Sequence, residues 1–402
     1  LKSAQVFEYI KHASDYGIQV SEAKPEFGNI VKRSRNVADG MSKGIQFLMK
    51  KNKIQVVMGT AKLLKDKKVE VTDNAGKKDL LTADHVIIAT GGRAKELPNL
   101  PIDGKNIIDY RKAMSLESLP KKMVIVGAGA IGVEFAYFYN SMGTQVTVVE
   151  FMEQGLVPRE DSDISKELTK IFKKAGIQSL ANTSVEKVEK TKEGLIVLTK
   201  DRKDNKETKI ECDVVLSAAG VTANIENLGL EDLGVIIEKG LIKVDAQYKT
   251  NVAGIYAIGD VTPGQALAHV ASAEGIICVE SIAGHHTQPI DYNNIPGCTY
   301  CNPEIASVGY TEQAAKDAGY EILVGKFPFS ASGKASASGS KEGFVKVIFD
   351  KKYGEFLGAH MIGMNVTEMI AEVVVARKLE TTGHEIVKAI HPHPTMSEAI
   401  ME

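Results

Sequence analysis

Cysteine is scarce in this chain of 402 residues, which contains only Cys212, Cys278, Cys298 and Cys301. Cysteines this few and scattered exclude the disulfide framework of a small secreted domain. Long apolar runs are also lacking, because none approaches the roughly 18 residues that a membrane-spanning helix needs. The first residues do not have the basic and then apolar profile of a signal peptide. We therefore expect a soluble protein of the cytoplasm, with the mitochondrial matrix as the alternative compartment, and no association with membranes.

An excess of charge of one sign is missing as well. The 49 Lys and Arg residues nearly balance the 51 Asp and Glu residues, which leaves a formal net charge of -2. This balance argues against a large basic surface for nucleic acid. The chain is long enough for two or three domains at roughly 150 residues each. Its 44% hydrophobic and 25% charged residues are typical of a soluble globular protein.

Strand-like and helix-like patterns alternate through most of the first 280 residues. Such alternation is typical of parallel sheets with crossover helices, so the expected fold class is α/β with two doubly wound domains, followed by a C-terminal α+β domain. A small antiparallel meander is expected between the first two strands. Over 121–150 the pattern predicts a strand, a glycine-rich turn, a helix that ends at about residue 141 and a strand at 145–149. The other expected strands are 54–57, 85–89, 254–258, 343–349 and 356–362, the other expected helices are 1–17, 28–53, 267–282 and 367–379, and 330–340 is expected to be a loop.

The strongest local signal is a G-x-G-x-x-G pattern at Gly127, Gly129 and Gly132, after an apolar strand and before a helix. Gly127 allows a tight turn, Gly129 lets the backbone approach a pyrophosphate, and Gly132 lets helix and strand pack closely. The next strand ends in Glu150, 18 residues past Gly132. A carboxylate there can bond both ribose hydroxyls and repels a 2′-phosphate, so the pattern predicts NAD. A purely structural glycine turn is the alternative.

Other strand ends carry related signals. Thr90, Gly91 and Gly92 follow one apolar strand, and Gly220 follows a similar strand in the second domain. Two nucleotide-binding units built alike explain this similarity. A third buried strand ends at Asp260, which either accepts a hydrogen bond from a ligand hydroxyl or caps the next helix. The residues leave both interpretations open.

The C-terminus carries a His-Pro-His-Pro pattern in which Glu398 follows His393 by five residues. The carboxylate could hold the imidazole ring, fix its tautomer and raise its basicity. A solvated histidine tail is the alternative. Cys298 and Cys301 form a C-x-x-C pattern without a second pair to complete a zinc site, and they lie in a strand-like stretch, so we expect two ordinary thiols. No metal site is predicted.

In this order the motifs resemble the flavin-dependent pyridine nucleotide-disulfide oxidoreductases. Within that family they are similar to the group that oxidises dihydrolipoamide with NAD. The resemblance extends over essentially the whole chain and rests on 89–92, the glycine motif, the strand ending at Asp260, 267–269 and 391–398. It implies an FAD-binding domain at 1–110 and 241–290, an NAD-binding domain at 111–240, and a dimerisation domain at 291–402 that forms a homodimer.

The resemblance also implies roles for individual residues. His393 matches the catalytic base and Glu398 its partner, and the implied protein partner is the lipoyl domain of a 2-oxoacid dehydrogenase complex or of the glycine cleavage system. The residues that match the NAD site are Gly127, Ala128, Gly129, Ala130, Ile131, Gly132, Glu134, Glu150, Val185 and Gly220. Those that match the FAD site are Ala61, Thr90, Gly91, Gly92, Asp260, Ala266, Leu267, Ala268 and His269.

Two departures from the family pattern accompany the resemblance. Family members begin with a strand, a G-x-G-x-x-G motif for FAD and a helix with a C-x-x-x-x-C redox pair, and these 402 residues contain none of them. Residues 1–16 resemble a stretch after that helix, so the chain is expected to lack an N-terminal segment. After Gly220 an arginine common in relatives is also missing. The resemblance implies that the protein oxidises protein-bound dihydrolipoamide through a redox disulfide and FAD and transfers hydride to NAD+. The alternative is an inactive fragment that binds NAD and dimerises.

Overall fold

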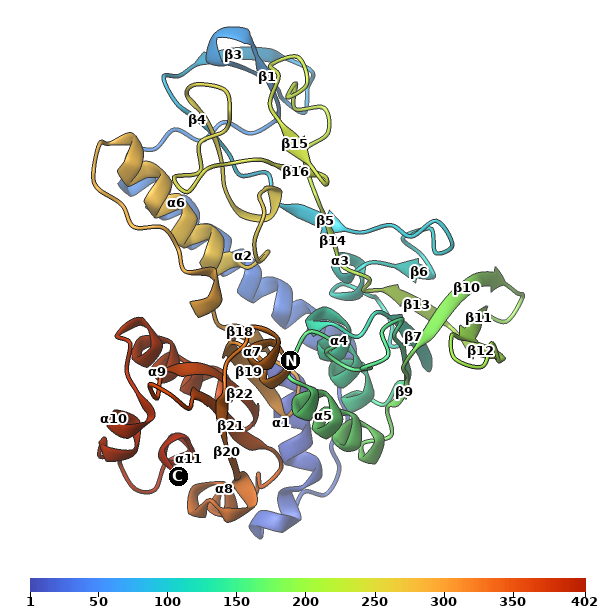
Figure 1. The fold of residues 1–402 in the computed structure, drawn as a ribbon. Helices are drawn as coiled ribbons and strands as arrows, with labels where there is room; N and C mark the ends of the chain where they lie inside the picture. The colour runs from blue at the N-terminus through green and yellow to red at the C-terminus, as the bar shows by residue number, and fades with distance from the viewer. The chain divides into compact units, whose positions relative to one another are not determined.

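The computed structural model describes residues 1–402 as two compact units (Figure 1). Unit 1 contains 1–33, 95–220 and 293–402, and unit 2 contains 34–94 and 221–292. These units do not test the functional domain limits drawn from the sequence, which stay a prediction. No helix combines the length and the apolar character that crossing a bilayer requires.

A five-stranded parallel sheet forms the centre of unit 1, with the strand order β6-β13-β7-β8-β9. β7 has β8 on one side and β13, which comes much later in the chain, on the other, so the strand order reverses at β7. Open α/β sheets bind ligands at such a reversal, beyond the carboxyl ends of the strands. The strands are β6 (Ile107–Ile108), β7 (Lys122–Val126), β8 (Gln145–Val149), β9 (Gln178–Leu180) and β13 (Val214–Ser217).

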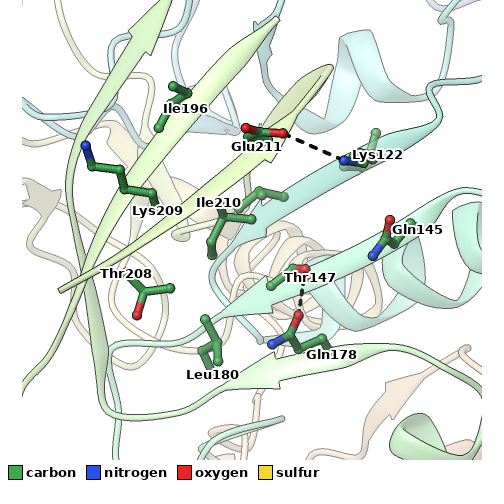
Figure 2. Close-up of a pocket in the computed structure, with 12 residues that line it drawn as sticks. Lys122, Gln145, Thr147, Gln178, Leu180, Ile196, Thr208, Lys209, Ile210 and Glu211 are labelled. Carbon is green, nitrogen blue, oxygen red and sulfur yellow. Dashed lines mark hydrogen bonds and ion pairs between the residues drawn. The ribbon is translucent and has the colours of Figure 1, made fainter. Parts of the chain in front are cut away.

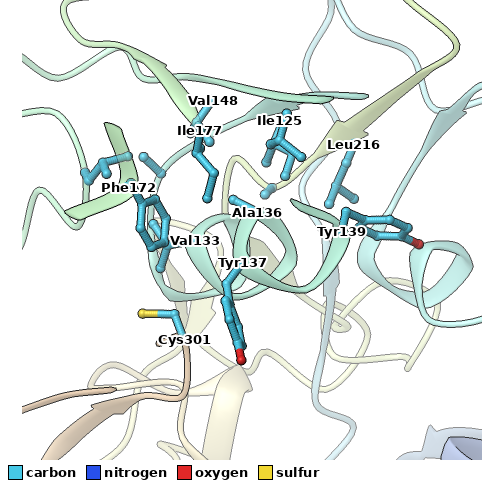
Figure 3. Close-up of a cluster of buried hydrophobic side chains, with 14 of the residues drawn as sticks. Ile125, Val133, Ala136, Tyr137, Tyr139, Val148, Phe172, Ile177, Leu216 and Cys301 are labelled. Atoms are coloured by element: carbon cyan, nitrogen blue, oxygen red, sulfur yellow. The ribbon is translucent and has the colours of Figure 1, made fainter. Parts of the chain in front are cut away.

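Helices cover one face of this sheet, as expected for the alternating pattern. Alternate residues of β7 and β8, including Ile125 and Val148, pack there against Val133 and Tyr139 of α4 and Phe172 of α5 (Figure 3). The Tyr139 hydroxyl donates a 2.6 Å hydrogen bond to the carbonyl of Ala113, so its polar end is satisfied in the core. The helices of this part are α1 (Lys2–Lys11), α3 (Tyr110–Ala113), α4 (Ala130–Ser141) and α5 (Ser162–Lys174).

An antiparallel meander lies on the other face (Figure 1). Its apolar residues, such as Val185 and Val197, pack there against Val124 and Val126 of β7. The meander contains β10 (Thr183–Lys190), β11 (Leu195–Asp201) and β12 (Glu207–Cys212). Sheet and meander separate toward the amino ends of β7, β8 and β9, which leaves a cavity of about 430 Å³ (Figure 2). Lys122, Gln145 and Gln178, the first residues of these strands, line it. The cavity therefore lies at the opposite end of the strands from the glycine motif.

The C-terminal part of unit 1 is a five-stranded antiparallel sheet with the order β18-β19-β22-β21-β20. The expectation of a loop at 330–340 is wrong, because α8 forms there when the Ser332 side chain accepts a hydrogen bond from the Ala335 amide and caps it. The strands of this C-terminal part are β18 (Gly297–Thr299), β19 (Glu304–Gly309), β20 (Ile322–Pro328), β21 (Phe344–Asp350) and β22 (Phe356–Gly363). Its helices are α7 (Glu312–Asp317), α8 (Gly333–Ala337), α9 (Val366–Lys378), α10 (Gly383–Lys388) and α11 (Glu398–Met401).

A buried ion cluster joins the start of α5 to the antiparallel sheet of unit 1. Lys346 of β21 is 1% exposed, and its ammonium lies 2.8 Å from Asp161, 3.2 Å from Asp163 and 2.7 Å from Glu312. Asp161 also accepts the backbone N–H groups of Asp163 and Glu312, so it caps α5 and holds the start of α7. Because an isolated buried ammonium would be very unfavourable, these three carboxylates are what allow Lys346 to lie inside.

Unit 2 is built around the parallel pair of β4 and β17. The small antiparallel meander expected before residue 85 is confirmed, and it has the three strands β1-β2-β3. Apolar residues of β1, β4 and β17 share one core. The strands are β1 (Thr60–Leu64), β2 (Lys68–Thr72), β3 (Lys78–Thr82), β4 (Val86–Ile88), β5 (Gly92–Ala94), β14 (Val221–Ala223), β15 (Ile237–Glu238), β16 (Leu241–Ile242) and β17 (Ile255–Ala257), and α6 is Ala268–Ile282. The helix α2 (Phe27–Lys51) begins in unit 1 and ends in unit 2.

The strand expected at 54–57 is wrong. The segment is irregular, and Ile54, Val56 and Val57 are 52%, 58% and 38% exposed. A strand needs a neighbour that satisfies its backbone groups, and no strand of the structure pairs with this segment. Its β-branched residues indicated a strand, but composition does not supply a partner.

Replacing the buried ammonium tests the importance of the ion cluster for stability. We expect Lys346→Met to reduce the free energy of unfolding by about 3 to 5 kcal/mol, because it leaves the buried carboxylate of Asp161 without a counter-charge. Lys316→Met is the matched control, since Lys316 pairs with the same Glu312 at 2.6 Å but on the surface, and should cost about 0.5 kcal/mol or less. Denaturant unfolding of both variants measures the difference. If both variants lost the same free energy of unfolding, the burial of Lys346 would not explain its contribution to stability.

Candidate functional site

The glycine motif forms a turn that only glycine can make at two of its positions. Gly127 follows β7 with φ of +102°, and a Cβ atom there would lie 2.5 Å from the carbonyl oxygen of Ala218. At Gly132, in the first turn of α4, a Cβ atom would lie 2.0 Å from the carbonyl oxygen of Gly127. Gly129 differs, because nothing lies within 4 Å of its Cβ position. The turn is therefore closed on the protein side and open at Gly129, where a ligand could approach.

Glu150 closes this turn from the next strand. One carboxylate oxygen accepts the N–H of Ala128 at 2.7 Å and the other accepts the N–H of Met152 at 2.9 Å. The carbonyl of Ala128 accepts the N–H of Val157 at 2.8 Å. The residue that the sequence assigned to a ribose thus also holds the backbone of the glycine turn, which the sequence pattern did not predict.

The structure brings most of the other predicted NAD residues to the same end of the sheet. Ala130 and Ile131 form the first turn of α4, and Gly220 follows β13, the strand beside β7. Glu134 accepts the N–H of Tyr300 at 2.8 Å, and burial raises the pKa of its carboxyl although this hydrogen bond opposes the shift. Val185 is buried in the core between sheet and meander.

Four of the predicted FAD residues meet in unit 2. The Thr90 hydroxyl donates to the carbonyl of Asn224 at 2.6 Å, and the Asn224 N–H donates to the carbonyl of Gly91 at 2.9 Å. Gly92 pairs with β14, and its Cβ position lies 3.1 Å from a carboxylate oxygen of Asp260. Thr90, Gly91, Gly92 and Asp260 therefore form one group of polar atoms at the ends of β4 and β17.

The helix-cap interpretation of Asp260 is wrong. Asp260 lies in a short 3-10 turn at 259–261, whereas the N-cap residue of α6 is Leu267. Its carboxylate is thus not used by the helix that follows. Ala268 and His269 are the first residues of α6, Leu267 is its N-cap and Ala266 precedes the cap. Ala61 is an exposed residue of β1.

Each of the two histidines of the His-Pro-His-Pro pattern contacts a carboxylate, with the His391 side chain buried and that of His393 exposed to solvent. His393 contacts Glu398 through Nδ1 at 2.8 Å, and the other oxygen of Glu398 accepts the N–H of Thr395 at 2.7 Å. These two hydrogen bonds lower the pKa of Glu398. His391 contacts Glu372 through Nε2 at 2.6 Å. Glu372 lies 19 residues earlier, on α9, and no sequence pattern pointed to it.

None of the four cysteines is activated. Burial raises the pKa of all four thiols, to about 12 for Cys212, and Cys301 is fully enclosed. All four are free thiols, and Cys298 and Cys301 do not form a disulfide. These raised pKa values agree with the expectation of two ordinary thiols at 298 and 301, because a protonated thiol is a poor nucleophile.

Comparison with known proteins assigns the family. A family model described as pyridine nucleotide-disulphide oxidoreductase matches residues 8–275, and the dimerisation-domain model of the same family matches residues 295–402. The chain belongs to the pyridine nucleotide-disulphide oxidoreductase family. The expected α/β fold class and the resemblance found in the sequence are both confirmed.

Curated relatives and a solved structure agree with this family. The chain is 47% identical over 418 aligned positions to a dihydrolipoyl dehydrogenase of Rhizobium etli, covering 100% of this chain and 86% of the relative. It is 44% identical to a dihydrolipoyl dehydrogenase of Zymomonas mobilis, again covering 100% and 86%. The crystal structure of LpdA from Mycobacterium tuberculosis superimposes with a TM-score of 0.91 at 26% identity, covering 100% of this chain and 86% of that chain.

The residues fit the two cofactors of this family, FAD and NAD. The open space at Gly129 and the free N–H groups at the start of α4 suit the pyrophosphate of NAD. In unit 2, the missing Cβ of Gly92 makes the room that the Asp260 carboxylate fills, and that carboxylate can accept a hydroxyl of the ribityl chain of FAD. The individual site residues stay predictions.

A substitution at the open glycine tests the NAD site without disturbing the turn. We expect Gly129→Val to fold normally, because its backbone is extended and its Cβ position is open, but to weaken NAD binding at least about tenfold by blocking the pyrophosphate. Gly28→Ala is the control, since its Cβ position is also open but lies on α2. Titration calorimetry with NAD and thermal unfolding measure both effects. Unchanged affinity in Gly129→Val would contradict the assignment.

The pair of His391 and Glu372 predicts a pH dependence of stability. Burial lowers the pKa of His391, but hydrogen bonds to Glu372 and to the carbonyl of Ala389 outweigh burial and raise it above its ordinary value. The pair therefore stabilises the fold fully below about pH 6.5, the pKa of an unfolded histidine, and loses this contribution as pH rises through the folded pKa. The melting-temperature difference between wild type and Glu372→Gln should shrink from pH 6 to pH 9.

The neighbouring Glu368→Gln on α9 is the control for this experiment, because Glu368 is exposed and the structure gives it no histidine partner. Its melting temperature should follow that of the wild type at every pH. A difference for Glu372→Gln that stays constant from pH 6 to pH 9 would show that His391 does not titrate against Glu372.

Proposed function

We propose that the protein is a dihydrolipoyl dehydrogenase, which oxidises protein-bound dihydrolipoamide through a redox disulfide and FAD and reduces NAD+. The observation that carries this proposal is the pair of His393 and Glu398, which matches the base and its partner in the dihydrolipoamide-oxidising group of this family. Bound FAD and NAD supply the electron and hydride transfer, and the chain supplies binding, orientation and proton handling.

His393 is proposed as the base that accepts the thiol proton of dihydrolipoamide. Glu398 accepts from Nδ1 at 2.8 Å, which fixes the tautomer and leaves Nε2 without a proton. The ring is 79% exposed, so a substrate from outside can reach it. The N–H of Thr395 holds Glu398 in place and lowers its pKa, so the carboxylate stays charged and stabilises the imidazolium when it forms.

The redox disulfide is a C-x-x-x-x-C pair in this family, and none of the four cysteines is assigned to it. Their spacing does not fit and their raised pKa values oppose thiolate formation. The alternative of an inactive NAD-binding fragment has no support from the relatives, because they match the whole chain under the name of an active enzyme.

The dimerisation domain supports a homodimer in which His393 serves the disulfide of the other subunit. The proposed partner is the lipoyl domain of a 2-oxoacid dehydrogenase complex or of the glycine cleavage system, since these carry lipoamide. Glu150 next to the glycine turn favours NAD over NADP. The cytoplasm is the proposed compartment.

Kinetics of the complete protein test the proposal. We expect NADH formation from dihydrolipoamide in the wild type, and a turnover at least about tenfold lower in His393→Gln because the general base is lost. His384→Gln is the control, since His384 is an exposed histidine on α10, and it should turn over at the wild-type rate. Unchanged turnover in His393→Gln would refute the assignment of the base. A wild type that forms no NADH would refute the function.

A further inference from the structure

A buried carboxylate on α6 has no role in the residues discussed so far. Glu274 is 1% exposed, and both of its oxygens are hydrogen-bonded. One accepts the backbone N–H of Gly259 at 2.6 Å, and the other accepts the hydroxyl of Tyr292 at 2.7 Å. Burying a carboxylate is unfavourable unless strong hydrogen bonds compensate. The hydrogen bond from the Gly259 N–H is such a compensating interaction, so Glu274 holds the turn at Gly259.

The peptide groups of Gly259 are held on both sides. Glu274 takes the N–H group, and the carbonyl accepts the N–H of Thr262 at 2.9 Å and its hydroxyl at 2.8 Å. The backbone is left-handed here, with φ of +73°, and a Cβ atom at Gly259 would lie 3.2 Å from the Cβ atom of Ala271. The turn therefore lies against α6, and it cannot move away from the helix without losing its hydrogen bond to Glu274.

Asp260 is the next residue of this turn. Its carboxylate already fills the space that the missing side chain of Gly92 leaves, at 3.1 Å from the Cβ position. Because Asp260 directly follows Gly259, the backbone bonds that fix Gly259 also fix the point from which the Asp260 side chain reaches this space. The position of Asp260 thus depends on the hydrogen bond between Gly259 and Glu274.

Two tyrosines hold Glu274 in turn. The hydroxyl of Tyr292 bonds Glu274, and the hydroxyl of Tyr248 lies 3.1 Å from that of Tyr292. Burial raises the pKa of both phenols, so they stay neutral and can donate. The ring of Tyr292 also lies 2.8 Å from the Cβ position of Gly264 in the segment between Asp260 and α6. The chain of contacts from Tyr248 to Asp260 is therefore continuous.

We propose that Glu274 is a positioning residue of the flavin site, which sets the place of Asp260 by holding the N–H of Gly259. This inference rests on the proposed function, in which Asp260 accepts a hydroxyl of the ribityl chain of FAD. Glu274 acts on the ligand only through the turn, because its own oxygens are both engaged inside the protein.

Flavin binding by three variants of the complete protein tests this role. Glu274→Leu removes both hydrogen bonds and should weaken FAD binding about tenfold or more, the effect of losing a hydrogen bond to a charged group. Glu274→Gln keeps an acceptor for Gly259 and a donor toward Tyr292, so it should remain within about threefold of the wild type by the same scale. Glu280→Gln, an exposed position on the same helix, should not change FAD affinity.

The measurements are flavin fluorescence quenching on adding FAD to the apoprotein, the visible spectrum of the bound flavin, and NAD binding as a check of folding. The proposal requires that Glu274→Gln rescue what Glu274→Leu loses. Equal FAD affinity in wild type and Glu274→Leu overturns it, as do equal losses in Glu274→Leu and Glu274→Gln. If Glu274→Leu does not fold, Tyr292→Phe replaces it as the test, because it removes the hydrogen bond that Tyr292 donates to Glu274. The proposal then requires that Tyr292→Phe bind FAD more weakly and change the spectrum of the bound flavin. A wild type that binds no FAD overturns the proposed function instead.

Discussion

The close contact between Gly132 and the carbonyl of Gly127 is the constraint on which the nucleotide-binding part of unit 1 depends. A Cβ atom at Gly132 would stand 2.0 Å from that oxygen, so any other residue would push α4 away from β7. Because α4 can start directly at the strand end, its first N–H groups lie at the reversal of strand order between β7 and β13. The core of Figure 3 forms along the side of the same helix that faces the sheet, so one contact at the first turn of α4 positions both this core and the helix N-terminus.

Around that constraint the protein repeatedly uses carboxylates to hold the backbone of turns. Glu150 holds Ala128, Glu274 holds Gly259, Glu398 holds Thr395 and Asp161 holds Glu312. Each of these N–H groups lies at a turn or helix start, where the backbone itself offers no acceptor. A charged acceptor makes a stronger bond than a neutral one, so turns that must keep one shape are stabilised in this way.

The sequence predicted the parts of this arrangement that depend on neighbouring residues. Apolar strands, the glycine turn and the His393 to Glu398 spacing are local patterns, and the structure contains them. The partners of Lys346, His391 and Gly259 could not be predicted, because they lie 15 to 185 residues away and only folding brings them together. The wrong strand at 54–57 has the same origin, since pairing is not a local property. Asp260 shows an intermediate case, in which a local pattern offered two roles and only the position of the α6 N-cap at Leu267 removed one of them.

Glu150 shows how one side chain can serve both structure and ligand. A carboxylate has about four acceptor positions on its two oxygens, and the N–H groups of Ala128 and Met152 use one on each. Two positions therefore remain for the hydroxyls of a ribose without any change in the glycine turn. Because the two backbone bonds fix the carboxylate at 8% exposure, its negative charge cannot turn away from a 2′-phosphate. In the proposed NAD site, the same bonds that shape the turn would hold this charge where it favours NAD over NADP.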